Sequence, residues 1–182
     1  MKNYGILMAK VLGILASGFM LNLAKDKKQR FGLHRQCDRL WYSIDRKQLY
    51  HVLRSLKLNG FVKIIRDSQN VEKIYLSEKG RNKWLQCQFR NLKITRKKNW
   101  DKKWRIVLFD IPETKRKIRD ALRKKLKNLG FLEFQKSVFI YPYPARDEIN
   151  FIINYFNIEY NVYYLETPIS PDKTFRGHFN LK

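Results

Sequence analysis

The segment SIDRKQLYHVLRSLKLNGF, residues 43–61, alternates apolar and polar positions with the period of a helix. An acidic residue, Asp45, lies where the first turn would be, and Asn59-Gly60 is a typical helix stop. The pattern predicts a helix of about fifteen residues. Its apolar side consists of Leu49, Val52, Leu53 and Leu56.

Two β-rich runs follow, FVKIIR at 61–66 and VEKIYLS at 71–77. The polar residues 67–70 between them have the composition of a turn, so we expect a hairpin. Ser77 is a good N-cap for the next segment. A second helix is predicted there, with one apolar face formed by Trp84, Leu85 and Phe89.

Near the N-terminus, the residues from Val11 to Ala24 carry no charge and follow Lys2 and Lys10, as in a signal peptide. This apolar stretch is shorter than the roughly 20 residues that cross a membrane. The alternative, which we favour because the remaining chain has cytosolic character, is a first helix buried against its neighbours.

The second half predicts a strand at 104–110, a helix at 114–128, a strand pair within 131–141, a helix at 146–156 and a strand at 161–166. This β-α-β-β-α-β order is that of a ferredoxin-like domain. Thr114 and Gly130 are the expected caps of the first of these helices. The last residues, FRGHFNLK, are expected to form an edge strand or a tail that crosses to a partner chain.

Composition supports two folded domains, because 44% of the residues are apolar and 14% aromatic. A basic run, RNLKITRKKNWDKKWR at 90–105, separates the two patterns. We therefore expect an α+β protein in which residues 1–98 form a nucleic-acid-binding domain with a basic linker and residues 99–182 form a second domain.

The formal net charge of +23 favours a polyanionic partner, and double-stranded DNA is the first choice rather than a membrane. Cys37 and Cys87 are too few and too far apart to indicate a disulfide framework, which is typical of a cytoplasmic protein. The basic and aromatic side chains expected to contact nucleic acid lie on three predicted elements. They are Arg46, Lys47, Tyr50 and Arg54 on the first predicted helix, Lys63, Arg66 and Lys73 on the hairpin, and Arg116, Arg119, Arg123 and Lys127 on a helix that no run of acids balances.

Over residues 1–90, the phrase LRSLKLNGFVKIIRDSQNVEKIYLSEKGRNKW resembles bacterial winged helix-turn-helix regulators. In the second half, WRIVLFDIPETKRKIRDALRKKLKNLGFLEFQKSVFIYP resembles two families. The first is the small CRISPR-associated adaptation nuclease, whose pattern of Asp-Ile, an Arg-rich helix, Gly and Gln-x-Ser-Val-Phe is matched over about residues 102–166. The second is the PaaX-type repressor of phenylacetate catabolism, which joins a winged helix to the same ferredoxin-like type and continues its strand into Ile-Pro-Glu, here residues 111–113.

The nuclease resemblance implies a homodimer in which Asp110 of each subunit ligates Mg²⁺, or Mn²⁺, and Ser137 orients the reacting groups. One carboxylate alone provides too few ligands for Mg²⁺, and the two-fold axis of a dimer supplies a second carboxylate. A metal-bound water would then hydrolyse a phosphodiester bond. The residues alone leave open that Asp110 only caps the following turn.

The resulting main hypothesis is a DNA-binding, metal-dependent endonuclease. Its main alternative is a non-enzymatic, PaaX-like transcriptional regulator whose second domain only dimerises. A third hypothesis is a DNA-holding partner of an integrase.

Overall fold

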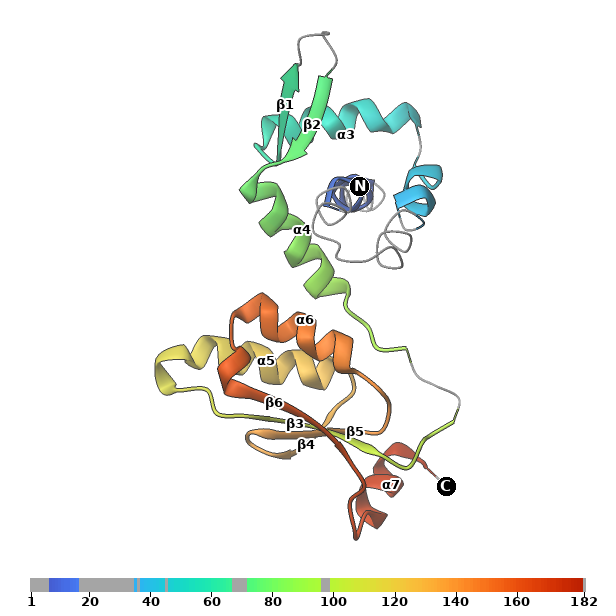
Figure 1. Cartoon of the computed structure of the whole chain (residues 1–182), viewed down its shortest axis with the longest axis vertical. Coiled ribbons are helices and arrows are strands. Elements are labelled where there is room, and N and C mark those ends of the chain that lie inside the picture. Colours follow the sequence, from blue (N-terminus) through green and yellow to red (C-terminus); the bar gives the residue numbers. More distant parts are fainter. Residues whose placement is uncertain are drawn as a thin grey trace. The chain divides into compact units, whose positions relative to one another are not determined.

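The computed structural model describes residues 7–16, 35, 37–44, 46–66, 72–95 and 99–181, and it divides the chain into two compact units, Met1–Arg90 and Asn91–Lys182. Each unit combines helices with an antiparallel sheet, as predicted (Figure 1). Within the described ranges, no helix has the length and apolar character needed to cross a bilayer. Residues 17–24 of the apolar stretch near the N-terminus lie outside those ranges.

The N-terminal unit begins with helical residues 7–16 and 37–42. The predicted helix and hairpin follow, although Asp45 and the turn at 67–70 lie outside the described residues. The core joins Leu12 of the first helix to Val52 and Leu56, all fully buried. The remaining elements of this unit are α3 (Arg46–Leu58), β1 (Val62–Arg66), β2 (Glu72–Leu76) and α4 (Glu78–Asn91).

Gly60, Ser77 and Gly80 connect the hairpin to the helices on either side of it. Gly60 has a φ of 69°, the left-handed conformation that ends α3. The Ser77 hydroxyl accepts a 3.0 Å hydrogen bond from the Gly80 amide and donates to the Gly60 carbonyl at 2.6 Å, which confirms Ser77 as the N-cap of α4. A Cβ atom added to Gly80 would lie 1.9 Å from the carbonyl oxygen of Phe61, so this position admits only glycine.

The C-terminal unit contains a four-stranded antiparallel sheet with the strand order β4-β5-β3-β6. Gly130, with a φ of 93°, ends α5 as predicted. The elements, in chain order, are β3 (Trp104–Phe109), η1 (Glu113–Lys115), α5 (Arg116–Asn128), β4 (Leu132–Gln135), β5 (Val138–Tyr141), α6 (Arg146–Phe156), η2 (Glu159–Asn161), β6 (Val162–Thr167) and α7 (Lys173–Phe179).

Helices α5 and α6 lie on one side of this sheet and α7 lies on the other (Figure 1). On the α7 side, Trp104 of β3 is fully buried against Phe175, with ring centroids 5.6 Å apart. The indole Nε1 of Trp104 also donates to Asp172 at 3.2 Å. Aromatic packing therefore holds the C-terminal helix to one end of β3.

Two local predictions for this unit are wrong. Residues 173–179 form a helix rather than an edge strand or a crossing tail, because Phe175 and Phe179 recur at helical spacing and pack together on Trp104. Thr114 does not cap α5: it lies inside η1, and the helix begins at Arg116 without a side-chain cap.

Candidate nucleic-acid interface

Helix α3 presents a polar and aromatic side to solvent, opposite its apolar core face. Tyr50 is 71% exposed and Arg54, one turn later, is also exposed, whereas Val52 and Leu56 are fully buried. Tyr50 and Arg54 therefore lie on the same exposed side of α3. Arg46 and Lys47 belong to α3, but their side chains lie outside the described part of the structure.

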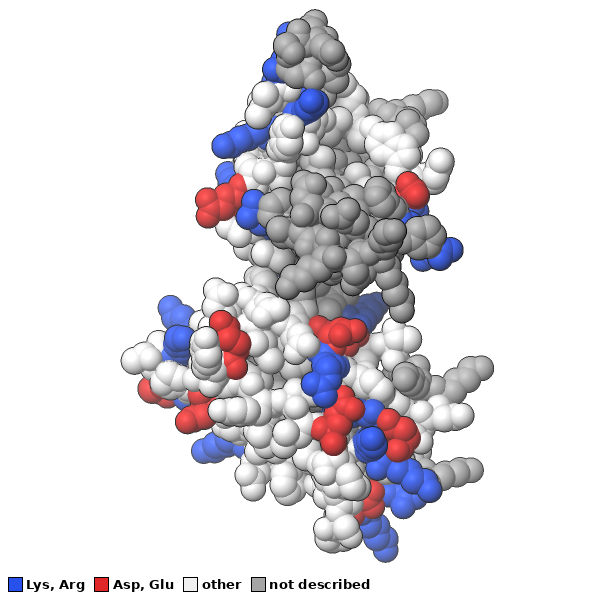
Figure 2. Space-filling model, viewed as in Figure 1, with Lys and Arg blue, Asp and Glu red and all other residues white. Residues whose placement is uncertain are grey.

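The hairpin places two of its three predicted cations on one face. Lys63 is the register partner of Tyr75, and Lys73 is the partner of Ile65, so these four exposed residues share the outer face. Arg66 is also exposed, but it follows Ile65 directly and so lies on the other face. Figure 2 shows Lys and Arg side chains around this hairpin.

The four predicted cations of α5 lie in ion pairs, so the expectation that no acids balance this helix is wrong. Arg119 contacts Glu113 at 2.8 Å, and Arg116 lies 3.7 Å from the same carboxylate. Arg123 contacts Glu133 of β4 at 2.5 Å, and Lys127 also pairs with Glu133. Figure 2 shows basic and acidic side chains side by side on this unit.

The β4 strand contributes Glu133 because the chain turns at Gly130 and returns beside α5. The two cations lower the pKa of Glu133, with the hydrogen bond from Lys127 as the larger cause and that from Arg123 next. Sequence spacing along α5 could not reveal this pairing, because the acid comes from a different element.

Asp110 directly follows β3, and its backbone is held by Asn161. The Asp110 amide donates to the Asn161 carbonyl at 2.9 Å, and the Asn161 side-chain amide donates to the Asp110 carbonyl at 2.8 Å. The Asp110 side chain is exposed, and no described residue forms a hydrogen bond or ion pair with its carboxylate. The turn-capping alternative is therefore not observed, and Asn161 is a contact that the sequence did not indicate.

Ser137 lies at the same end of the sheet as Asp110. The Ser137 carbonyl accepts a 3.1 Å hydrogen bond from the amide of Phe109, the residue before Asp110. The structure thus brings together the backbones of the two residues that the nuclease resemblance singles out.

The acids near this end of the sheet do not complete a metal site within one chain. No group of three His, Cys, Asp or Glu side chains is close enough to hold an ion among the described residues. Glu113 and Asp120 are paired with arginines of α5. Asp110 is therefore a single carboxylate donor, and one chain alone does not fit Mg²⁺.

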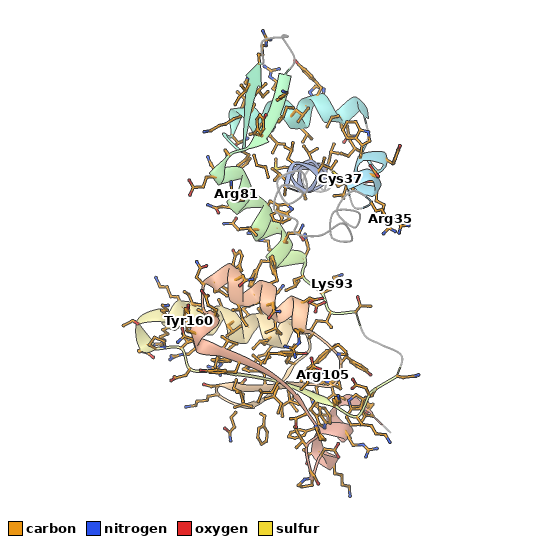
Figure 3. All side chains as sticks on the ribbon, in the orientation of Figure 1. Arg35, Cys37, Arg81, Lys93, Arg105 and Tyr160 are labelled. Atoms are coloured by element: carbon orange, nitrogen blue, oxygen red, sulfur yellow. The ribbon has the colours of Figure 1, made fainter. Side chains whose placement is uncertain are left out.

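A buried arginine, Arg105, is paired with a half-exposed acid at the other end of β3, and sequence patterns did not indicate this pair. Arg105, labelled in Figure 3, is 2% exposed and contacts both carboxylate oxygens of Asp101, at 2.6 and 2.5 Å. It also donates to the carbonyls of Lys103 at 2.7 Å and Pro142 at 2.9 Å. The Arg105 hydrogen bond is the main reason that the pKa of Asp101 falls to about 2.

Residues 97–175 match the family model of the PaaX protein central Cas2-like domain. No curated protein matches the chain. The matched segment lies wholly within the C-terminal unit and includes no residue of the N-terminal unit. The comparison supports the predicted PaaX-type relationship and a Cas2-like fold for this segment, while fusion to an adaptation nuclease stays a prediction.

Proposed function

We propose that the chain is a DNA-binding transcriptional regulator of the PaaX type that acts as a homodimer in the cytoplasm. In this proposal, the N-terminal unit is a winged helix-turn-helix with α3 as the recognition helix and β1-β2 as the wing. The C-terminal unit is a ferredoxin-like domain that dimerises. The order of elements in each unit and the Cas2-like match support this assignment.

The observation that carries the proposal is the exposed set formed by Tyr50, Arg54, Lys63 and Lys73. An α-helix fits the major groove of B-DNA, where an arginine can read guanine and the hairpin lysines can contact phosphates. A chain with a net charge of +23 would bind DNA with strong salt dependence.

The sheet offers a surface for dimerisation on the side opposite α5 and α6. Ile106 and Leu108 of β3 are register partners of Leu165 and Tyr163 of β6, and these two partners are 47% and 60% exposed. These four residues and Val138 form an apolar area near the end of β3 that precedes Asp110, and α7 does not cover this area. Burial of such an area between two copies would stabilise a two-fold dimer.

A second candidate is the metal-dependent nuclease. The exposed Asp110 carboxylate, which forms no hydrogen bond or ion pair with a residue in the described part of the chain, favours it. By strand alternation, Asp110 follows Leu108 on the apolar side of the sheet, where a second copy would bring another Asp110. A Mg²⁺ ion held there would stabilise charge on a phosphodiester. This candidate requires the dimer, because one chain supplies a single donor. No observation favours an integrase partner.

Selection of bound duplexes from a random library by the full chain distinguishes the candidates. The regulator predicts enrichment of a palindromic sequence, retention of that preference in Asp110→Ala, and intact DNA after incubation with Mg²⁺. Equal affinity for all duplexes would count against the regulator. Mg²⁺-dependent cleavage that is lost in Asp110→Ala would establish the nuclease instead.

A further inference from the structure

Helix α5 carries two lysines whose surroundings differ from those of its other cations. Four cations are paired with Glu113, Asp120 or Glu133, and Lys125 is buried. Lys117 and Lys124 are exposed, and no described acid lies within ion-pair distance of either one. Neither lysine was among the residues selected from the sequence.

We propose that Lys117 and Lys124 form a phosphate-binding pair that contacts the nucleic-acid backbone outside the sequence-reading surface. This inference rests on the proposed DNA-binding function and assigns the C-terminal unit a direct part in it. The neighbouring arginines serve to hold α5 against η1 and β4 through their acidic partners.

The geometry of α5 favours this pair. Residues seven positions apart lie on the same side of a helix and are separated by roughly 10 Å along its axis. That distance corresponds to about three phosphate steps of one DNA strand, at about 3.4 Å each along the duplex axis. The long, flexible lysine side chains can then reach separate phosphates.

Electrostatics favours the lysines over the paired arginines. A phosphate approaching Arg123 or Lys127 also approaches the negative charge of Glu133, which already accepts from both cations. Lys124 borders a shallow hollow of about 370 Å³ whose one acid is Asp120, and the Asp120 carboxylate lies 3.8 Å from Arg116. Asn128 there can donate a further hydrogen bond to a phosphate oxygen. The residues that line the hollow are Asp120, Arg123, Lys124, Lys127 and Asn128.

The test compares the salt dependence of DNA binding in two full-length variants with equal charge changes. The first is Lys117→Gln/Lys124→Gln. The matched control, Lys102→Gln/Lys173→Gln, removes two exposed lysines of the same unit that lie outside α5. Fluorescence anisotropy with a random-sequence duplex at several salt concentrations gives the slope of log affinity against log salt.

We expect the α5 variant to reduce the magnitude of that slope by about 1 to 2, because each lost phosphate contact contributes roughly 0.9. The control should change the slope by less than about 0.5. Equal changes in both variants, or an unchanged slope in the α5 variant, would overturn the inference. So would loss of binding to phosphatidylserine vesicles with unchanged DNA binding. If the unaltered chain binds no duplex at all, the proposed function itself fails.

Discussion

Some basic side chains of the two units that were predicted to contact nucleic acid have different electrostatic surroundings. In the N-terminal unit, Arg54 and Lys63 extend into solvent from elements whose acids are few. In the C-terminal unit, Arg119 and Arg123 are as basic in sequence but contact carboxylates from neighbouring elements. Basic composition alone therefore does not identify a phosphate-binding surface, since the partner of each cation decides what it can contact.

The largest loss of stability is expected from Gly80→Ala. This substitution should destabilise the N-terminal unit and leave the C-terminal unit unchanged. The added methyl group would collide with the Phe61 carbonyl, so α4 and the hairpin must move apart. We expect a loss of about 3 kcal/mol in the stability of the N-terminal unit, together with loss of DNA binding. Urea unfolding followed by circular dichroism measures the first and anisotropy measures the second.

Gly177→Ala is the matched control for this substitution. Gly177 lies in α7, and a Cβ added there would meet no atom within 4 Å. Alanine should therefore leave stability unchanged or raise it by up to about 1 kcal/mol. If Gly80→Ala and Gly177→Ala unfold at the same urea concentration, the close packing of α4 against the hairpin is incorrect.

Arg105→Ala should have the opposite effect, because it should destabilise the C-terminal unit and leave the N-terminal unit unchanged. Removal of the buried guanidinium leaves the Pro142 carbonyl without the 2.9 Å hydrogen bond and Asp101 without its partner. We expect the C-terminal unit to lose about 3 kcal/mol of stability, because the substitution leaves a cavity and removes hydrogen bonds to buried groups. Analytical ultracentrifugation should show loss of the dimer, and circular dichroism should show that the N-terminal helices stay folded. An unaltered unfolding midpoint of the C-terminal unit would contradict this expectation.

Glu133→Gln should give two cations of α5 surroundings like those of the exposed cations in the N-terminal unit. The substitution frees Arg123 and Lys127 from their carboxylate. We expect tighter binding to random duplex DNA and a salt slope about 1 to 2 larger in magnitude. Weaker binding in the same anisotropy assay would show that the paired state, rather than the free cations, contacts DNA.

The smallest expected effect is a loss of stability of the C-terminal unit at acid pH, caused by protonation of Asp101. The folded-state pKa of Asp101 is about 2, below its ordinary value of 3.8, so its ionised form stabilises the fold. This contribution is complete above about pH 4 and is lost as the pH falls toward 2. Because Asp101 is half exposed, solvent screening keeps the effect modest. Unfolding midpoints of the unaltered chain and Asp101→Asn should converge as the pH falls through this range.

Local patterns predicted most of the helices and strands because these elements depend on neighbouring residues. The period of Val52 and Leu56 located α3, and Ser77 marked the start of α4. The helix at 173–179 was missed because it is stabilised by packing on Trp104, which is distant in sequence. Aromatic residues there are equally compatible with a strand until their contact is known.

The candidate site was less predictable for the same physical reason. Exposure of Tyr50 and Arg54 follows from the apolar face of their own helix. The pairing of Arg123 with Glu133, the clamp from Asn161 to Asp110 and the burial of Arg105 all join different elements. Such contacts depend on the tertiary fold, so sequence spacing identified the charged residues but not which of them are neutralised.

In the proposed function, the exposed surface of the N-terminal unit reads DNA. The most direct test of this proposal is the affinity of the full chain for its selected duplex after Tyr50→Ala/Arg54→Ala, compared with Arg119→Ala, a change of equal charge. We expect a loss of affinity of about ten- to a hundredfold for the α3 variant and a change below about threefold for Arg119→Ala. A larger loss for Arg119→Ala than for the α3 variant would contradict it.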